Sequence, residues 1–290
     1  MRSCPACGGR NSRRLGEKNS FEIYSCRSCV SLYTDRVPEA TEAENYDEYY
    51  CDDNLSVPEF IIGRVNEIVD EFSGFRETNR LLDIGFGAGT ILDVASQHGW
   101  KSHGLEVSKP AVDQARIRGY EVFHGGLREA KFPDHYFDVI TASEILEHLP
   151  EPEADLREIV RILRPGGLFW GTTPSARGLS FRLLKLNWSV LSPPEHIQLY
   201  SKAGAMILLT KAGFNQINFR TNGLNPMEIV DHFRPNRSTD HKFDRVDTGY
   251  LLNEGLTKSP SRKMIKALLN RSLDVLGLGD SLKIYAQTNK

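Results

Sequence analysis

Apolar residues in the middle of the chain follow two patterns that alternate. Short continuous runs predict buried strands at residues 81–84, 101–106, 120–123, 137–142 and 168–172. Residues 91–97, 110–118 and 156–163 instead have the three- and four-residue apolar spacing of amphipathic helices, and Pro165-Gly166-Gly167 is expected to stop the last of them. Such alternation predicts a parallel sheet covered by helices.

The flanking segments extend this pattern. Ile61, Val65, Ile68, Val69 and Phe72 predict a first amphipathic helix, and residues 201–212 predict a late one. Further strands are expected at residues 215–220 and 280–288, so the predicted fold class is α/β, with a doubly wound seven-stranded sheet spanning residues 59–290. Two insertions, at residues 174–200 and 221–279, follow carboxyl ends of strands. Because open α/β sheets bind ligands at that edge, we expect the insertions to form the substrate pocket.

A glycine-spaced turn follows the first strand of the sheet and carries the main functional signal. Asp83 precedes three glycines at alternate positions, Gly85, Gly87 and Gly89, and glycine is needed where backbone takes positive φ or approaches a ligand closely. The next strand ends in Glu106, the usual place to hold two ribose hydroxyls. Together these features predict a nucleoside site.

The spacing of the glycines distinguishes between two classes of cofactor. Dinucleotide enzymes use G-x-G-x-x-G so that a pyrophosphate rests on the helix N-terminus. Here the spacing is G-x-G-x-G, and Asp83 would repel an anion but attract an ammonium or a sulfonium. A nicotinamide-dependent dehydrogenase is therefore disfavoured, and a purely structural tight turn would explain neither Glu106 nor the motifs that follow.

This turn resembles motif I of the class I S-adenosylmethionine-dependent methyltransferases, and residues 132–140, 144–149 and 163–168 resemble the later motifs of that family in order. The resemblance covers roughly residues 59–220 and implies S-adenosylmethionine as cofactor. It implies that Glu106 holds the ribose and Val107 the adenine face, for which plain core packing is the alternative. The remaining contact residues that it implies are Asp83, Gly85, Phe86, Gly87 and Gly89 at the turn, Gly126 and Leu127 at the adenine, and Ser143 at the floor of the site.

Three polar residues after the fourth strand are candidates for the chemistry. Glu144, Glu147 and His148 stand at i, i+3 and i+4, which predicts one face of a helical turn, and His196 in the first insertion could reach it. A hydroxyl acceptor needs a base or a metal to remove or acidify its proton. The set resembles the metal site of small-RNA 2′-O-methyltransferases and ubiquinone-pathway O-methyltransferases. A divalent metal, a histidine base or acceptor ligand, and a structural role all remain open.

The first 29 residues contain two C-x-x-C pairs, Cys4 with Cys7 and Cys26 with Cys29. Four thiolates at this spacing can bind Zn²⁺ tetrahedrally, and so small a segment has too few apolar residues to fold without such a site. We therefore expect a structural zinc ribbon at residues 1–36. The turn after each cysteine pair favours glycine. Gly8 follows the first pair and fits this preference, whereas Val30 follows the second pair and departs from it.

Residues 37–58 are expected to form a linker or lid between the ribbon and the main domain. Tyr46, Tyr49 and Tyr50 cluster there, and in many class I methyltransferases such a segment folds over the cofactor. Packing of an ordinary linker onto the core is an equal alternative for any single tyrosine.

Composition restricts the choice of partner. The 290 residues are 40% hydrophobic and carry a net charge of only −2, which disfavours a nucleic acid partner. No run reaches the roughly 18 apolar residues of a membrane span, so we expect a cytoplasmic protein. The predicted activity is methyl transfer to a small-molecule or sugar-like acceptor, with oxygen as the favoured accepting atom. The chain resembles bacterial methyltransferases of polysaccharide and secondary-metabolite pathways. The alternatives are an RNA methyltransferase whose ribbon binds RNA, as in the rRNA guanine-N1 methyltransferases, and a non-catalytic binding module.

Overall fold

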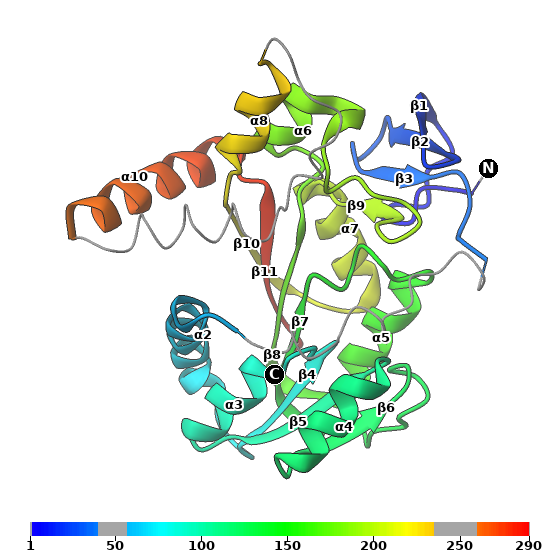
Figure 1. Ribbon diagram of the computed structural model, residues 1–290. Helices are drawn as coiled ribbons and strands as arrows, with labels where there is room; N and C mark the ends of the chain where they lie inside the picture. The colour runs from blue at the N-terminus through cyan, green and yellow to red at the C-terminus, as the bar shows by residue number, and fades with distance from the viewer. Residues whose placement is uncertain (1, 40–56, 235–259, 290) are drawn as a thin grey trace.

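The computed structural model describes residues 2–39, 57–234 and 260–289 (Figure 1). Its main sheet has seven strands in the order β10-β11-β8-β7-β4-β5-β6, which confirms the predicted α/β class. The strands are β4 (Arg80–Ile84), β5 (Lys101–Glu106), β6 (Glu121–His124), β7 (Phe137–Ser143), β8 (Leu163–Pro174), β10 (Gln216–Asn222) and β11 (Ser281–Gln287). The sheet is mostly parallel, and β11 runs antiparallel to both of its neighbours.

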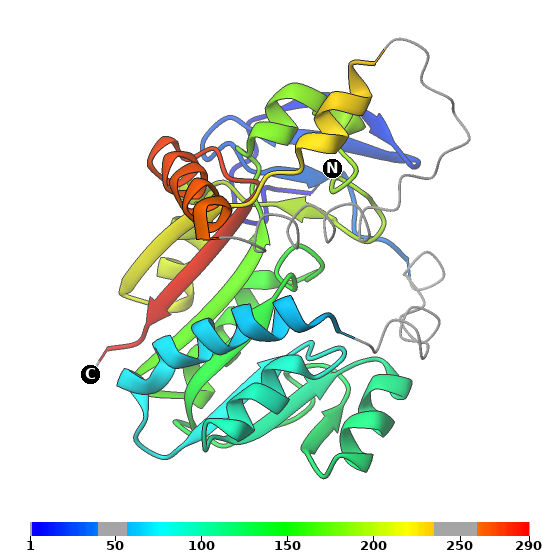
Figure 2. The ribbon, with the colours of Figure 1, turned by 60° about the vertical axis from the view of Figure 1, so that its left-hand side comes forward.

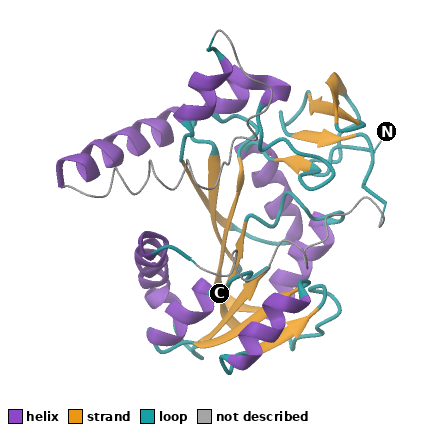
Figure 3. Ribbon diagram, viewed as in Figure 1, coloured by secondary structure: helices purple, strands orange, loops and turns teal. Residues whose placement is uncertain are grey.

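Helices cover both faces of this sheet (Figure 3). One face carries α2 (Glu59–Glu71), α3 (Thr90–Gln97) and α4 (Lys109–Ile117), and the other carries α5 (Pro152–Ile162) and α7 (Lys202–Ala212). Successive strand residues point to opposite faces, so Leu81 packs in the cluster that contains Ile68 of α2, while Leu82 packs in the cluster that contains Leu156 of α5. Strands buried on both faces therefore read as continuous apolar runs in the sequence.

The junction between α5 and β8 differs from the expectation. Pro165-Gly166-Gly167 was expected to separate helix from strand, but β8 begins at Leu163, directly after α5 ends. Leu163 already pairs with Phe137, and a register irregularity follows in β7 before Val139. Gly166, with φ of +70°, shapes the first part of the strand rather than a loop in front of it.

A buried carboxylate closes the amino-terminal edge of the sheet. Asp138 in β7 is fully buried, and its Oδ2 accepts hydrogen bonds from the backbone N–H groups of residues 77–79 at 2.7–2.9 Å. The Arg164 guanidinium donates to its Oδ1 at 2.7 Å. Burial alone would raise the pKa of Asp138, but the Glu77 N–H and Arg164 outweigh it, and the pKa lies below its usual value.

The cysteine-containing segment forms a second, smaller sheet together with the first insertion. In this sheet β1 (Ser12–Lys18), β2 (Phe21–Cys26) and β3 (Leu32–Thr34) are followed by β9 (Gln198–Leu199), which lies far along the chain. We call residues 2–36 the ribbon. The ribbon and the first insertion thus share one sheet, because β3 of the ribbon pairs with β9 of the insertion. Figures 1 and 2 both show the ribbon beside this insertion.

The ribbon also packs against the start of α7. A Cβ on Gly204 would lie 2.1 Å from Ser31 Oγ, so the helix backbone approaches the ribbon closely at this point. Ser201 caps α7 by accepting the Gly204 N–H at 2.9 Å, and its own Oγ donates to the Cys29 carbonyl. The first turn of α7 is thus bonded directly to the second cysteine pair.

The insertions contain short helices and one long one. The first carries α6 (Leu179–Leu184), the 3₁₀ turn η3 (Lys185–Asn187) and Trp188, which is buried against Phe21 and Ile23 of the ribbon. The second carries α8 (Pro226–His232) and α10 (Pro260–Leu276), which projects from the body in Figure 1. A 3₁₀ turn, η2 (Phe72–Phe75), follows α2. Helices long and apolar enough to cross a bilayer are absent from the described ranges. The predicted lid tyrosines, Tyr46, Tyr49 and Tyr50, lie outside the described residues.

Candidate active site

The glycine turn after β4 has the backbone conformation that its sequence predicts. Gly85, Gly87 and Gly89 have φ of +68°, +51° and +79°, a region that side chains with a Cβ rarely adopt. A Cβ on Gly85 would also lie 2.1 Å from Ile145 Cδ1, so no side chain fits there. The turn therefore presents backbone without side chains at the carboxyl edge of the sheet. Gly85 lies against Ile145, the residue after Glu144.

Phe86, between the first two glycines, points away from this edge. Its ring is buried with Leu92 of α3 and Ala111 of α4, and a Cβ on Gly104 would lie 2.5 Å from the ring. Phe86 can therefore offer a ligand only its backbone. Its side chain instead fixes the turn to the sheet.

Glu106 at the end of β5 faces the glycine turn. Its Oε2 accepts the Gly87 N–H at 3.0 Å, and its Oε1 accepts the N–H groups of Val107 and Ser108 at 2.7 and 3.0 Å. Only 4% of Glu106 is exposed, so backbone donors hold this carboxylate at the strand end. Val107 next to it is half exposed, whereas Leu127, expected at the same place, lies in the core.

Asp83 lies within β4, two residues before Gly85. It is 2% exposed, and its Oδ1 accepts a hydrogen bond from Thr141 Oγ1 at 2.7 Å. Burial raises the pKa of Asp83 to about 7; the Thr141 bond opposes this shift, and the nearby negative charge of Glu106 adds to it. Two carboxyl groups thus meet at the ends of adjacent strands, and their combined charge favours a cationic ligand.

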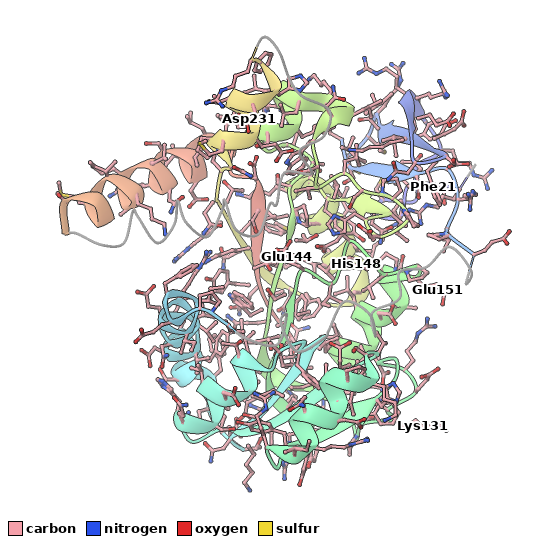
Figure 4. All side chains as sticks on the ribbon, viewed as in Figure 1. Phe21, Lys131, Glu144, His148, Glu151 and Asp231 are labelled. Atoms are coloured by element: carbon pink, nitrogen blue, oxygen red, sulfur yellow. The ribbon has the colours of Figure 1, made fainter. Side chains whose placement is uncertain are left out.

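The loop after β7 carries three of the expected catalytic residues, but it is not helical. Glu144 has φ of +55°, and residues 146–148 form a turn, so the expected common helical face is wrong. Ser143 and Glu144 are exposed, whereas Glu147 is fully buried. Figure 4 shows Glu144 and His148 in the middle of the molecule, between the main sheet below and the insertions and ribbon above.

Glu147, His148 and His196 meet at one point. One potential ligand atom from each lies within 4.8 Å of the others, and Glu144 is not part of this group. The two imidazole rings are edge to face with centroids 4.7 Å apart. Each histidine places Nδ1 against a backbone carbonyl, His148 on Glu195 at 3.0 Å and His196 on Val190 at 2.5 Å. These contacts make Nδ1 the donor in each ring, and the backbone of Glu144 also forms a hydrogen bond with the His148 imidazole.

The electrostatics of this cluster follow from its burial. Burial, followed by the adjacent carboxylate of Glu144, raises the pKa of Glu147 well above its usual value. Its Oε2 accepts from Thr173 Oγ1 at 2.9 Å, while Oε1 has no hydrogen-bond partner among the described residues. Burial, followed by repulsion from His196, lowers the pKa of His148 to about 4, so this imidazole is neutral at physiological pH.

Three residues that contact this cluster were not anticipated from the sequence. Thr173 binds Glu147, Gln198 donates to the Leu146 and Leu149 carbonyls at 3.1 and 2.6 Å, and Tyr200 donates to the Leu146 carbonyl at 3.3 Å. The available signal is an isolated amide in the apolar run 197–200. A fully buried amide needs partners for all its polar atoms, and here the nitrogen finds them in the loop after β7 and the oxygen in Arg2.

The four cysteines converge as their spacing predicts. Sγ of Cys4 lies 3.6 Å from Cys29, Sγ of Cys7 lies 3.5 Å from Cys26, and all four sulfurs fall within 4.8 Å of one another. The two knuckles match, because the N–H after each pair donates to the carbonyl of its first cysteine. Val30 adopts φ of +63°, the counterpart of Gly8 at +75°, despite its branched side chain.

Two clefts lie outside the cluster of Glu147, His148 and His196. One, of about 550 Å³, is lined by Ala88, Thr90 and Asp93 beside the glycine turn and by Ile62 of α2, but not by Asp83 or Glu106. The other, of about 560 Å³, lies between the ribbon and α6. Four basic side chains line it, Arg13, Arg177, Arg182 and Lys185.

Fold, glycine turn and strand-end carboxylates together define an α/β protein built like the methyltransferases. The chain belongs to the methyltransferase domain family, whose model matches residues 57–218, more than half of its length. The predicted resemblance to methyltransferases is thereby confirmed.

Curated relatives and solved structures agree with this assignment. The chain is 32% identical over 133 residues to a 27-O-demethylrifamycin SV methyltransferase of Amycolatopsis mediterranei, which covers 43% of this chain and 49% of that protein. It is 28% identical over 120 residues to a ubiquinone biosynthesis O-methyltransferase of Shewanella, covering 39% and 51%. The chain thus spans about half the length of these relatives. A SAM-dependent methyltransferase from Archaeoglobus fulgidus shares the fold, with a TM-score of 0.56, 19% identity, and coverage of 84% of this chain and all of that one.

The raised pKa of Asp83 predicts a pH-dependent stability. The folded chain binds this proton more tightly than the unfolded chain, so its stabilising effect is complete below pH 4 and is lost as the pH rises through 7. Between pH 5 and 7 the free energy of unfolding should fall by about 2 kcal/mol more in the native protein than in Asp83→Asn. Urea unfolding of the ligand-free protein measures this difference.

Glu17→Gln provides the control, since Glu17 is an exposed carboxylate of the ribbon, and this variant should keep the native slope. Equal pH slopes for the native protein and Asp83→Asn would contradict the raised pKa.

Proposed function

We propose that this protein transfers a methyl group from S-adenosylmethionine to an oxygen atom of a small molecule. The observation that carries the proposal is the pairing of a bare glycine turn with the Glu106 carboxylate at the ends of adjacent parallel strands. The residues fit the cofactor, because the glycine turn presents backbone without side chains at positive φ and the carboxyl groups suit a cation carrying ribose hydroxyls.

Each cofactor residue then has a defined task. Glu106 accepts the two ribose hydroxyls, Asp83 supplies negative charge beneath the amino acid portion, and half-exposed Val107 covers one face of the adenine. Gly126 and Ser143 bound the same space from neighbouring strand ends. When bound, the cofactor supplies an electrophilic methyl group, so the main work of the chain is to align the acceptor and exclude water.

The acceptor site lies at Glu147, His148 and His196. A general base here has to be neutral before it takes a proton, and the low pKa of His148 ensures this, although it also makes that imidazole a weak base. The geometry supports a divalent metal more strongly. Two imidazoles have Nδ1 held by carbonyls, and they face a carboxylate oxygen without a hydrogen-bond partner in the described part of the chain, which is the ligand set and supporting hydrogen bonds of a metal centre. A metal held there by Glu147, His148 and His196 would acidify the acceptor hydroxyl.

Acceptor class follows from the relatives and the charge. Both relatives described above are named for small-molecule methylation, the Shewanella one as an O-methyltransferase, and the net charge of −2 counts against a polyanionic acceptor. The groove of Arg13, Arg177, Arg182 and Lys185 is the one observation that favours the RNA alternative. Strongly salt-dependent RNA retention by the protein would decide for that alternative.

We also propose that the ribbon holds a structural zinc ion through Cys4, Cys7, Cys26 and Cys29. Tetrahedral zinc with Zn–S bonds of about 2.3 Å places its sulfurs about 3.8 Å apart. The Sγ pairs at 3.5 and 3.6 Å support this geometry. The matched knuckles and the convergence of all four sulfurs to within 4.8 Å of one another support the same site.

Methyl transfer tests the proposed function directly. The purified protein should bind S-adenosylmethionine by calorimetry and release S-adenosylhomocysteine with a panel of phenolic and sugar-like acceptors. Glu106→Gln should weaken cofactor binding about 10- to 100-fold, because charge-assisted bonds to the ribose are lost. Glu121→Gln on the next strand, where the carboxylate is 82% exposed, should bind normally. Failure of the native protein to bind this cofactor would overturn the proposal.

Metal analysis tests the ribbon site. We expect about one zinc ion per chain by inductively coupled plasma mass spectrometry, and its loss in Cys29→Ser together with a lower melting temperature. Cys51→Ser removes the fifth cysteine of the chain and should retain the zinc. Full zinc content in Cys29→Ser would rule out the four-thiolate site.

A second metal distinguishes the two chemical roles of the histidines. Added Co²⁺ should give a visible absorption band beyond that of the ribbon, and His196→Ala should abolish this additional band. His98→Ala, far along α3 and partly exposed, serves as the matched control. If the native protein binds no second ion, the base role remains and the metal role is excluded.

A further inference from the structure

We propose that the ribbon positions the acceptor site through two residues, Arg2 and Gln198, which we call the Arg2–Gln198 link. They act as positioning residues rather than catalytic ones. The link connects three segments that are remote in sequence: the start of the ribbon, β9 of the first insertion, and the loop after β7. This inference rests on the proposed function for its effect on methyl transfer, but not for its structural effect.

Arg2 binds across the boundary between the ribbon and the insertion. Its Nε donates to the Thr34 carbonyl of β3 at 3.0 Å, while Nη2 donates to the Ile197 carbonyl at 2.7 Å and to Gln198 Oε1 at 3.2 Å. The Thr34 N–H donates to the same Ile197 carbonyl at 3.0 Å. One guanidinium therefore fixes the first strand position of β9 relative to the ribbon.

Gln198 carries this constraint into the catalytic loop. It is 1% exposed, and its Nε2 donates to the carbonyls of Leu146 and Leu149. Those two residues flank Glu147 and His148 in the chain. The amide has one orientation that satisfies all its contacts, because only the nitrogen can donate to carbonyls and only the oxygen can accept from Arg2.

All three residues of the acceptor cluster depend on this segment. His196 immediately precedes Ile197, and the Ile197 N–H donates to the Glu147 carbonyl at 3.1 Å. His148 is held by the Glu195 carbonyl. A shift of residues 195–198 would therefore displace both imidazoles and the carboxylate together, and a displacement of 1 Å can cost about 100-fold in rate.

The cofactor residues are supported differently. Asp83 is bonded to Thr141 of β7, and Glu106 is bonded to backbone of the glycine turn and of its own strand end. Loss of the link should thus alter the acceptor half of the site and leave the cofactor half unchanged. A general loss of structure would alter both.

Histidine NMR provides a test that needs no acceptor. Imidazole signals of His148 and His196 are assigned with the variants His148→Gln and His196→Gln, then compared in Gln198→Met and Arg2→Lys. Gln198→Met keeps the side-chain length and removes both donors, while Arg2→Lys keeps the charge but loses the multiple directed bonds. We expect both signals to shift in both variants. They should stay fixed in Arg14→Gln, where an exposed arginine of the same ribbon is changed.

Cofactor affinity and turnover complete the test. Calorimetry should show S-adenosylhomocysteine affinity within about twofold of native in each variant. With an acceptor in hand, kcat should fall about 10- to 100-fold while the KM for S-adenosylmethionine stays constant. If Gln198→Met does not fold, Arg2→Lys alone decides the question.

Unchanged histidine signals in a folded variant would overturn the link, as would a parallel loss of cofactor affinity. Shifted signals with native affinity support it, even if no acceptor is ever methylated. In that last case the proposed function fails and the link stands.

Discussion

The carboxylate of Asp138 holds together the edge of the main sheet opposite the candidate site. It gathers three successive backbone N–H groups and one guanidinium around a fully buried charge, and so joins the segment before β4 to the starts of β7 and β8. Because every donor is present, the burial of this charge is compensated rather than destabilising. The opposite edge carries Asp83, which accepts a hydrogen bond from Thr141, and Glu106, which accepts backbone N–H groups of the glycine turn and of its own strand end.

The two ends of the sheet illustrate how hydrogen-bond donors decide the direction of the pKa shift of a buried carboxyl group. Asp138 has a lowered pKa since backbone and Arg164 outweigh its burial. Asp83 and Glu147 are as deeply buried, but their pKa values are raised because donors are few and other carboxylates are near. Raised pKa values of this kind lie at the two places where we propose that a cation binds, beside the glycine turn and at the histidine pair.

Local patterns were sufficient to predict most of the main sheet. The run 101–106 became β5 at the same residues, and the helix at 201–212 ended at Gly213 as its left-handed cap requires. The nature of the glycine turn was equally predictable, because positive φ at three alternate positions is a local property. β8 starts earlier than the sequence predicts. Strand pairing with β7 overrides the local preference of Pro165-Gly166-Gly167 to separate helix from strand.

The acceptor half of the site depended on contacts that no local pattern encodes. The spacing of Glu144, Glu147 and His148 suggested a helix, yet Glu144 takes a left-handed conformation and the loop turns instead. The roles of Gln198 and Arg2 come from pairing between segments that are 195 and 196 positions apart. The spacing of the four cysteines predicted a ribbon. It did not predict that β3 of the ribbon would pair with β9 of the first insertion.

The pairing of β3 with β9 has a consequence for the order in which the protein is built. A ribosome releases the ribbon long before residues 198 and 199 exist, so the small sheet keeps an open edge while most of the main sheet is synthesised. Closing that edge is a late, non-local event, and it is the same event that brings His196 beside His148. Nascent chains therefore acquire the strands that carry the glycine turn and Glu106 before the segment that brings His196 beside His148.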